Sequence, residues 1–221
     1  MDEFIIRQAT ANDVPFLVET IIEAEKSGTD RLTYSTVFGL TLEESRKYIA
    51  EMLYEEIDGC ELSVSSFLVA EKNGETAAAL SAWIEGSEGI PSTSLKGNLL
   101  NFILPKKCIE RAMKINSVIS DLHIEYYPGT IQIGAGYVAK EFRGNNLLGI
   151  LTARIIERLS ETNRGVSQIY TQIFDCNTPS IRTNEKLNFK VVMLKESSNE
   201  EIINYLPSNK KILMKKELST L

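Results

Sequence analysis

Short apolar runs along the N-terminal half of the chain have the β-branched composition and length of strands. Such runs occur at 4–7, 66–70 and 76–83. The last two flank Asn73-Gly74, which is the strongest short-range signal for a two-residue hairpin turn. The pattern therefore predicts a first strand followed later by an antiparallel hairpin.

Helix-period segments separate the first strand from this hairpin. One predicted helix follows a capping-box pattern at 10–13 and stops at 27–30. A second follows a cleaner capping box at 41–44 and ends at 58–59. The segment 31–40 between them has no clear period, so we expect an ordered loop there.

The segment from Glu85 to Pro128 has the least regular pattern in the chain. Three glycines and a proline predict a loop, and a dense apolar cluster follows at 99–104. From Lys106 the apolar positions recur with a helical period, and basic side chains occupy the other face.

A strand predicted at 130–138 contains Gly134 and Gly136, and interior glycines often mark a bulge or a close approach of another group. From Tyr137 to Ser160 the pattern indicates a strand end, a loop built on Arg143-Gly144, and a long amphipathic helix. The free N–H groups and dipole at such a helix start favour phosphate. The alternative interpretation is an ordinary strand–helix connection.

The C-terminal part of the pattern predicts three further strands, at 169–174, 189–194 and 211–214. A short helix follows the turn at 175–179, and another is expected at 200–205. We find no repeats, low-complexity tracts or linkers. The fold class predicted is one mixed α/β domain.

Composition narrows the functional classes. The chain has 221 residues, is 43% hydrophobic, and carries a net charge of −6 with scattered basic residues, which argues against nucleic-acid binding and suits an amine partner. Its three cysteines lie far apart and it has one histidine, so neither a disulfide framework nor a metal site is expected. The acidic N-terminus and the lack of a long apolar run predict a cytoplasmic protein with no membrane segment.

The order of elements and two motifs resemble the GNAT N-acetyltransferase superfamily. The family's cofactor loop, R/Q-x-x-G-x-G/A, falls on 143–148, and NTPSIRTNEKLNF at 177–189 looks like its second landmark. IIRQATANDVPFL and FLVAEKNGETAAALSAW look like its opening strand and helix and its central hairpin. The resemblance implies a central, mostly antiparallel sheet flanked by helices. It places one domain over 1–221, with an insertion at about 85–128 between the third and fourth strands.

The loop departs from the family pattern where small residues are usual. Asn146 and Leu148 occupy those positions, and a glycine arrives one position late at Gly149. Asn146, like Asn188 in the second landmark, tolerates left-handed backbone angles better than most residues. Leu148 is expected to loosen the approach of the backbone to a pyrophosphate.

The resemblance implies acetyl-CoA, or another acyl-CoA, as co-substrate, and no metal. The strand end would hydrogen-bond the pantetheine arm, the loop backbone would hold the pyrophosphate, and an asparagine of the next turn would reach the pantetheine. These expected cofactor-binding residues are Gly136, Tyr137, Val138, Arg143, Gly144, Asn145, Asn146, Leu147, Leu148 and Asn177.

The groups that would move protons are less clearly marked. Gln132 stands where the family carries a strand glutamate; an amide cannot accept a proton, so we expect it to orient substrate or water. Glu125 is the candidate catalytic base, acting through a water, and His123 is the alternative base. Tyr126, like Gln132, is a candidate for contact with the substrate. Asn184 replaces the tyrosine that many members use as an acid, so proximity and orientation would supply most of the rate.

The predicted function is transfer of an acetyl group from acetyl-CoA to the amine of a small molecule or peptide. The alternative is a catalytically weak or inactive module with the same fold that binds acyl-CoA or a protein partner. A dinucleotide-binding Rossmann enzyme fits less well, because helices and a hairpin precede the glycine loop. The segment 85–128 is expected to roof the acceptor site or to form a homodimer contact through Leu99 to Leu104.

Overall fold

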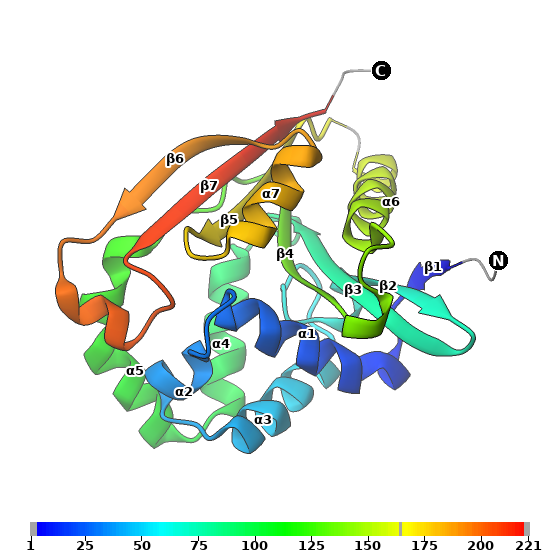
Figure 1. Ribbon diagram of the computed structural model, residues 1–221. Coiled ribbons are helices and arrows are strands. Elements are labelled where there is room, and N and C mark those ends of the chain that lie inside the picture. Colours follow the sequence, from blue (N-terminus) through cyan, green and yellow to red (C-terminus); the bar gives the residue numbers. More distant parts are fainter. Residues whose placement is uncertain (1–3, 164, 219–221) are drawn as a thin grey trace.

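The computed structural model describes residues 4–163 and 165–218, which are built around one seven-stranded sheet (Figure 1). The strands are β1 (Ile5–Gln8), β2 (Phe67–Lys72), β3 (Glu75–Ile84), β4 (Ile131–Val138), β5 (Gln168–Phe174), β6 (Lys190–Glu196) and β7 (Lys210–Glu217). Their order in the sheet is β1-β2-β3-β4-β5-β7-β6. All neighbouring pairs are antiparallel except β4 with β5.

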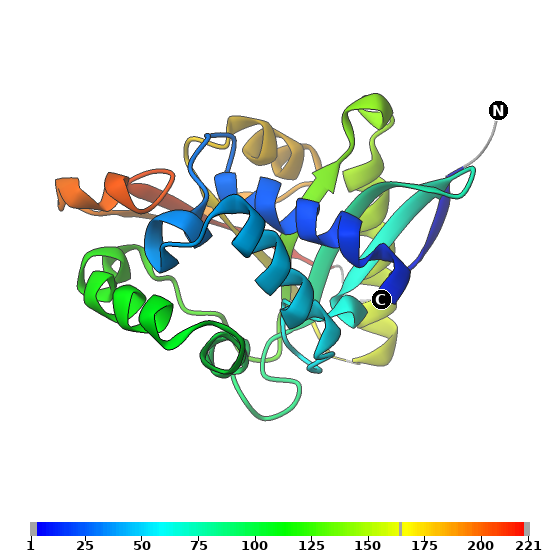
Figure 2. The ribbon, with the colours of Figure 1, turned by 90° about the horizontal axis from the view of Figure 1, so that it is seen from below.

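Helices cover both faces of this sheet (Figures 1 and 2). They are α1 (Val14–Lys26), α2 (Thr33–Phe38), α3 (Leu42–Tyr54), α4 (Ser92–Ile103), α5 (Lys106–Ile119), α6 (Leu147–Thr162) and α7 (Thr178–Lys186). The helices α1 to α5 lie on one face, and α6 and α7 lie on the other. The predicted class, a mixed α/β fold with a mostly antiparallel sheet, is confirmed.

Alternate residues of the central hairpin enter two separate cores. Phe67, Val69 and Ala79 pack in the core beneath α1 and α3, whereas Leu68 and Leu80 pack in the core beneath α6. Because both faces are covered, these strands are apolar at nearly every position. Burying each large side chain contributes roughly 1.5–3 kcal/mol.

Both predicted capping boxes form. Thr41 and Glu44 exchange hydrogen bonds at the start of α3, and Thr10 and Asp13 do so before α1. Arg7 also donates to Asp13, at 2.7 and 2.9 Å. Burial alone would raise the pKa of Asp13, but the bonds from Arg7 and Thr10 outweigh it and lower the pKa to about 2.

Several expected elements differ from the structure. The predicted loop 31–40 contains α2, a short helix without a strong period, held by the buried side chains of Tyr34 and Val37. The next helix, α3, ends at Tyr54, before 58–59. Residues 200–204 form a 3-10 turn in place of the expected helix.

The largest difference lies in the insertion, where the predicted loop region is occupied by α4. Gly97 lies inside this helix. The backbone N–H of Ser92, the first residue of α4, donates to the carboxylate of Glu85, seven residues earlier in the chain. The Glu85 carboxylate is 3% exposed and accepts hydrogen bonds from the backbone N–H and hydroxyl of Ser92 and from Trp83 Nε1. One buried carboxylate therefore attaches α4 to the end of β3 and fixes the Trp83 indole.

Replacing Glu85 with alanine should lower the free energy of unfolding by about 2–4 kcal/mol, because it leaves three buried donors without an acceptor. Urea titration followed by fluorescence suits the test, since Trp83 is the only tryptophan. Glu88→Ala, at an exposed position of the same segment, should stay within about 0.5 kcal/mol of wild type. Equal effects of the two substitutions would contradict the assigned role.

Candidate active site

The sheet opens between β4 and β5. The two strands pair only from Ile131 opposite Ile169 to Ile133 opposite Thr171. Beyond that point β4 continues to Val138 paired with β3 alone. Its other edge therefore presents unpaired backbone groups in the middle of the sheet, where an extended ligand with amide groups can add like a strand.

A bulge causes β4 to diverge. Its partners in β3 step from Leu80 to Ala82 while β4 steps from Gly136 to Ile133, so β4 carries one extra residue. A Cβ on Gly134 would lie 2.6 Å from Ser81 Oγ, and one on Gly136 would lie 2.8 Å from Leu80 Cδ1. The two glycines thus mark both a bulge and a close approach, as predicted.

The loop between β4 and α6 leaves donors exposed. Gly144 and Asn146 have φ angles of +88° and 55°, so the chain turns through left-handed conformations into the helix. Asn146 precedes α6, but its side chain makes no capping hydrogen bond. The first N–H groups of α6 are therefore open toward a hollow of about 160 Å³ beside Arg143 and Leu148.

The asparagine and the late glycine of this loop fit each other. A Cβ on Gly149 would lie 2.5 Å from Asn146 Oδ1, so glycine makes room for the asparagine side chain. The prediction that Asn146 and Asn188 adopt left-handed angles is confirmed, since Asn188 has a φ of 66°. Leu148 is half-buried, and its Cδ2 would lie 3.3 Å from a Cβ on Gly136, at the diverging part of β4.

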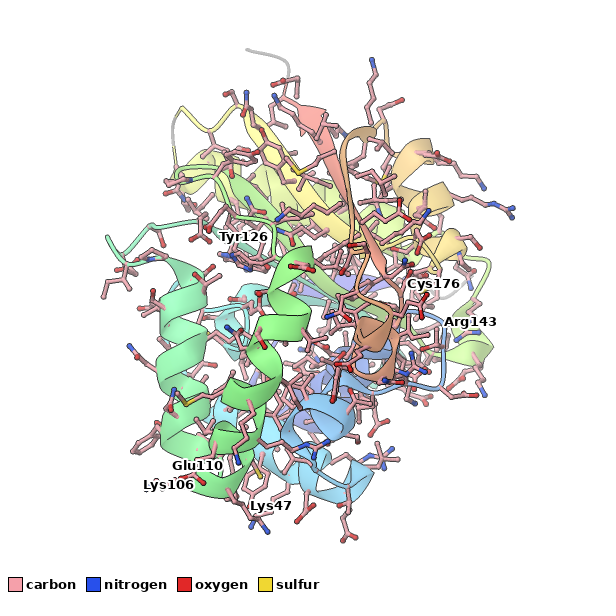
Figure 3. All side chains as sticks on the ribbon, turned by 90° about the vertical axis from the view of Figure 1, so that its left-hand side faces the viewer. Lys47, Lys106, Glu110, Tyr126, Arg143 and Cys176 are labelled. Atoms are coloured by element: carbon pink, nitrogen blue, oxygen red, sulfur yellow. The ribbon has the colours of Figure 1, made fainter. Side chains whose placement is uncertain are left out.

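A cavity of about 1200 Å³ extends from this loop through the opening in the sheet to the face covered by α1 to α5. Arg143 and Asn177 line its end nearest α6 and α7. Tyr126 lines the opposite end, and Figure 3 shows it well separated from Arg143. The cavity thus has a loop end and a far end. We call the far end the acceptor chamber; its lining includes Glu25, Glu61, Trp83, Lys96, Tyr126 and Lys211.

An ionic and aromatic group forms one wall of the acceptor chamber. The ring of Tyr126 meets that of Trp83 edge-on at 5.5 Å, and its hydroxyl lies 3.5 Å from Glu61. Glu61 also forms an ion pair with Lys96 of α4. Burial alone would lower the pKa of Lys96, but Glu61 outweighs it and raises the pKa, so this ammonium stays charged. Burial raises the pKa of Tyr126, which stays protonated.

Lys211 and Glu25 also line the chamber, and they differ from this pair. Neither makes a hydrogen bond or ion pair with any residue in the described part of the chain. Lys211 begins β7, and its Nζ lies 5.7 Å from the ring centre of Phe174. Burial lowers the pKa of Lys211 to about 8, and the nearby Glu25 opposes this shift.

The structure separates the candidate residues for chemistry. Glu125, 86% exposed, is not part of the cavity lining; its carboxylate lies 3.5 Å from His123 Nε2, and His123 itself is at the lining. Gln132 is buried outside the lining and donates to Thr130 Oγ1 at 2.7 Å. Tyr126 does line the chamber. Neither Glu125 nor Gln132 is therefore brought to the cavity.

The candidate cofactor residues fall mostly together. Those on the cavity or the adjoining hollow are Gly136, Tyr137, Val138, Arg143, Gly144, Asn146, Leu147, Leu148 and Asn177. Asn145 lies outside both linings and donates to the carbonyl of Phe142. Asn177 accepts from the N–H of Ser180, so it caps α7 while it faces the cavity.

The charged groups of the acceptor chamber have no signal in the sequence. Glu25, Glu61, Lys96 and Lys211 come from four distant segments, and no spacing connects them. Among residues 4–163 and 165–218 no group of three or more His, Cys, Asp or Glu side chains is arranged to hold a metal ion. None of the helices in that part of the chain has the length and apolar character needed to span a membrane.

The lowered pKa of Lys211 has a consequence for stability. Between pH 8 and 10.5 the folded chain releases this proton while the unfolded chain still binds it, so the free energy of unfolding of the wild type should rise with pH there. Lys211→Met should be more stable than wild type at pH 7, by a margin that shrinks across this window. Urea titrations at pH 7, 9 and 10 measure it; Lys210→Met, which removes a surface partner of Glu196, is the control. A margin independent of pH would contradict the shift.

Comparisons with known proteins place the fold. No family model matches the chain, and no curated protein matches its sequence. Among solved structures, an N-acetyltransferase from Staphylococcus aureus Mu50 superposes with a TM-score of 0.66 at 13% identity, covering 96% of this chain and 100% of that one.

Two further solved structures have named acceptors. The polyamine N-acetyltransferase of Drosophila melanogaster superposes with a TM-score of 0.59 at 14% identity, over 98% and 100% of the two chains. The ribosomal-protein-S18-alanine N-acetyltransferase of Escherichia coli superposes with a TM-score of 0.52 at 13% identity, over 99% and 96%. At these identities the likeness concerns the fold, and this chain has the fold of the GNAT N-acetyltransferases.

Proposed function

We propose that the protein is an N-acetyltransferase that moves an acetyl group from acetyl-CoA to an amine. The observation that carries this proposal is the unpaired edge of β4 beside the uncapped start of α6. The edge offers hydrogen bonds to the amides of a pantetheine arm, and the helix start offers N–H groups to a pyrophosphate. The solved structures of this fold that are named as polyamine and ribosomal-protein N-acetyltransferases support the same reaction class.

The residues present fit this co-substrate. Gly134 and Gly136 keep side chains away from the bulge, and Gly144 has no heavy atom within 4 Å of an added Cβ. Residues 136–138 would bind the pantetheine, and the backbone of 144–148 would bind the pyrophosphate. Acetyl-CoA supplies a reactive thioester, and the N–H of Val138 or its neighbour would donate to the oxygen that becomes negative.

Proton transfer would depend on water. The ammonium first loses a proton to water, and the neutral amine nitrogen then forms a bond to the acetyl carbon. A second proton passes from the nitrogen to water, and the C–S bond breaks as the thiolate leaves. Gln132 and Asn184 cannot exchange protons, and Asn184 donates to the carbonyl of Ser180 in α7. The cavity reaches solvent-exposed residues such as His123, so water can carry protons. Positioning would then supply most of the rate.

The direct test measures binding and turnover separately. Calorimetry with CoA reports the cofactor site, and release of free thiol from acetyl-CoA with a panel of amines reports transfer. Binding together with turnover of at least one amine supports the proposal. Binding without turnover of any amine would support the alternative of a non-catalytic module, and no binding would contradict both.

Leu148 provides a sharper test of the loop. We expect Leu148→Ala to tighten CoA binding by about three- to tenfold, because it shortens a side chain that lines the cavity next to Gly136 and keeps a good helix former at that position. Leu148→Gly should act in the same direction.

Ile150→Ala is the matched control for this substitution, since Ile150 lies on α6 but is exposed and off the cavity. Calorimetric titration of the three proteins with CoA measures the effect. Weaker or unchanged binding in both Leu148 variants would show that this loop does not hold the pyrophosphate.

A further inference from the structure

The acceptor chamber holds one carboxylate and one ammonium that have no hydrogen-bond or ion-pair partner among the described residues. Glu25, near the end of α1, and Lys211, at the start of β7, both line the cavity and lack any hydrogen bond or ion pair within the described residues. The two groups influence each other electrostatically but are not in ion-pair contact. Both side chains are half-buried, and a half-buried charge without an ion-pair partner is stabilised by a ligand group of opposite sign.

The other charged groups of the chamber are already paired. Glu61 is bound by Lys96 and approached by Tyr126, and Glu23 is bound by Lys26 at 2.6 Å. A ligand gains little by competing for these carboxylates. The available charges are therefore one negative, at Glu25, and one positive, at Lys211.

Unpaired hydroxyls face the same space. Ser81 is 1% exposed, lines the cavity, and its Oγ has no hydrogen-bond partner among the described residues. The buried Oγ1 of Thr33, at the start of α2, also lines the cavity and also has no partner there. Buried polar groups are normally satisfied, so these two atoms indicate a polar ligand.

The insertion limits the size of that ligand. Lys96 of α4 and Asn116 and Ile119 of α5 line the chamber opposite the sheet. Both helices lie over the same face as α1 and α2 in Figure 2. This cover favours a small molecule over a folded protein substrate.

We propose that the acceptor is a small diamino acid: Lys211 binds its carboxylate, Glu25 binds its α-ammonium, and its second amine receives the acetyl group. This assignment rests on the proposed function, because it names the acceptor class of the same site. A dication would satisfy Glu25 but would place a positive charge beside Lys211. An anionic amine without a second ammonium would satisfy Lys211 and leave Glu25 unpaired. Only a zwitterion complements both groups.

Matched substrates separate the two charges. Lysine and ornithine carry both charges and keep a side-chain amine as the acceptor, cadaverine and putrescine lack the carboxylate, and 6-aminohexanoate lacks the α-ammonium of lysine. We expect kcat/KM, measured by thiol release, to be at least about tenfold higher for each amino acid than for its decarboxylated counterpart. Where turnover is too slow, calorimetric binding to the CoA complex should follow the same order.

Variants assign each charge to its residue. Lys211→Met should remove the preference for lysine over cadaverine, by raising KM for lysine and by lowering KM for cadaverine, whose second ammonium no longer lies beside a positive charge. Glu25→Gln should remove the preference for lysine over 6-aminohexanoate. Glu19→Gln on α1, whose carboxylate pairs with Arg46, and Lys210→Met, which pairs with Glu196, should leave both preferences intact.

The outcomes distinguish this inference from the proposed function. CoA binding with turnover of putrescine or cadaverine equal to that of the amino acids would overturn the inference and keep the function. Equal turnover of peptide amides that have a free N-terminus, or a preference that survives in Lys211→Met, would also overturn it. Failure of CoA to bind, with no amine turned over, would overturn both.

Discussion

The candidate active site depends on one feature of the sheet: β4 and β5 stop pairing after Ile133, before β4 ends. A central strand normally satisfies its backbone through both neighbours, and unpaired N–H and C=O groups within a sheet are unfavourable. Here the bulge at Gly134 turns β4 away after Ile133, so its free edge must be satisfied from outside the protein. The start of α6 lies next along the chain, so a second set of unpaired donors continues the first. An extended ligand with amides at one end and phosphates at the other matches that order.

The insertion converts this opening into an enclosed chamber. Glu85 joins the end of β3 to the start of α4, and the same carboxylate holds the indole of Trp83 against Tyr126. The ends of the insertion are also held together, because the backbones of Glu85 and Thr130 are hydrogen-bonded. The position of Lys96 on α4, and hence its ion pair with Glu61, depends on this attachment. The contacts that stabilise the insertion therefore also determine the shape of the chamber.

Local signals in the sequence predicted most of the fold. The capping boxes, the Asn73-Gly74 turn, the interior glycines of β4 and the left-handed asparagines each act through neighbouring residues, and each is found in the structure. Helix α4 was missed because its N-terminal acceptor, Glu85, is distant and Gly97 interrupts its pattern. Glu125 lies just ahead of β4 in the sequence, but its side chain is exposed to solvent, because closeness in sequence does not fix the direction of a side chain. Residues gathered from four segments have no local signal at all.

The charge arrangement of the chamber cannot be explained by folding alone. Lys211 loses hydration on burial and forms no ion pair within residues 4–163 and 165–218, so its lowered pKa corresponds to an unfavourable contribution to stability at neutral pH. An apolar side chain beside Phe174 would avoid that contribution. Surface ion pairs such as Arg46 with Glu19 show that the chain does pair charges where only stability is concerned. Uncompensated groups of this kind concentrate at functional sites, where the missing partner is a ligand. The unpaired lysine and carboxylate are therefore better evidence for the acceptor than the paired residues that surround them.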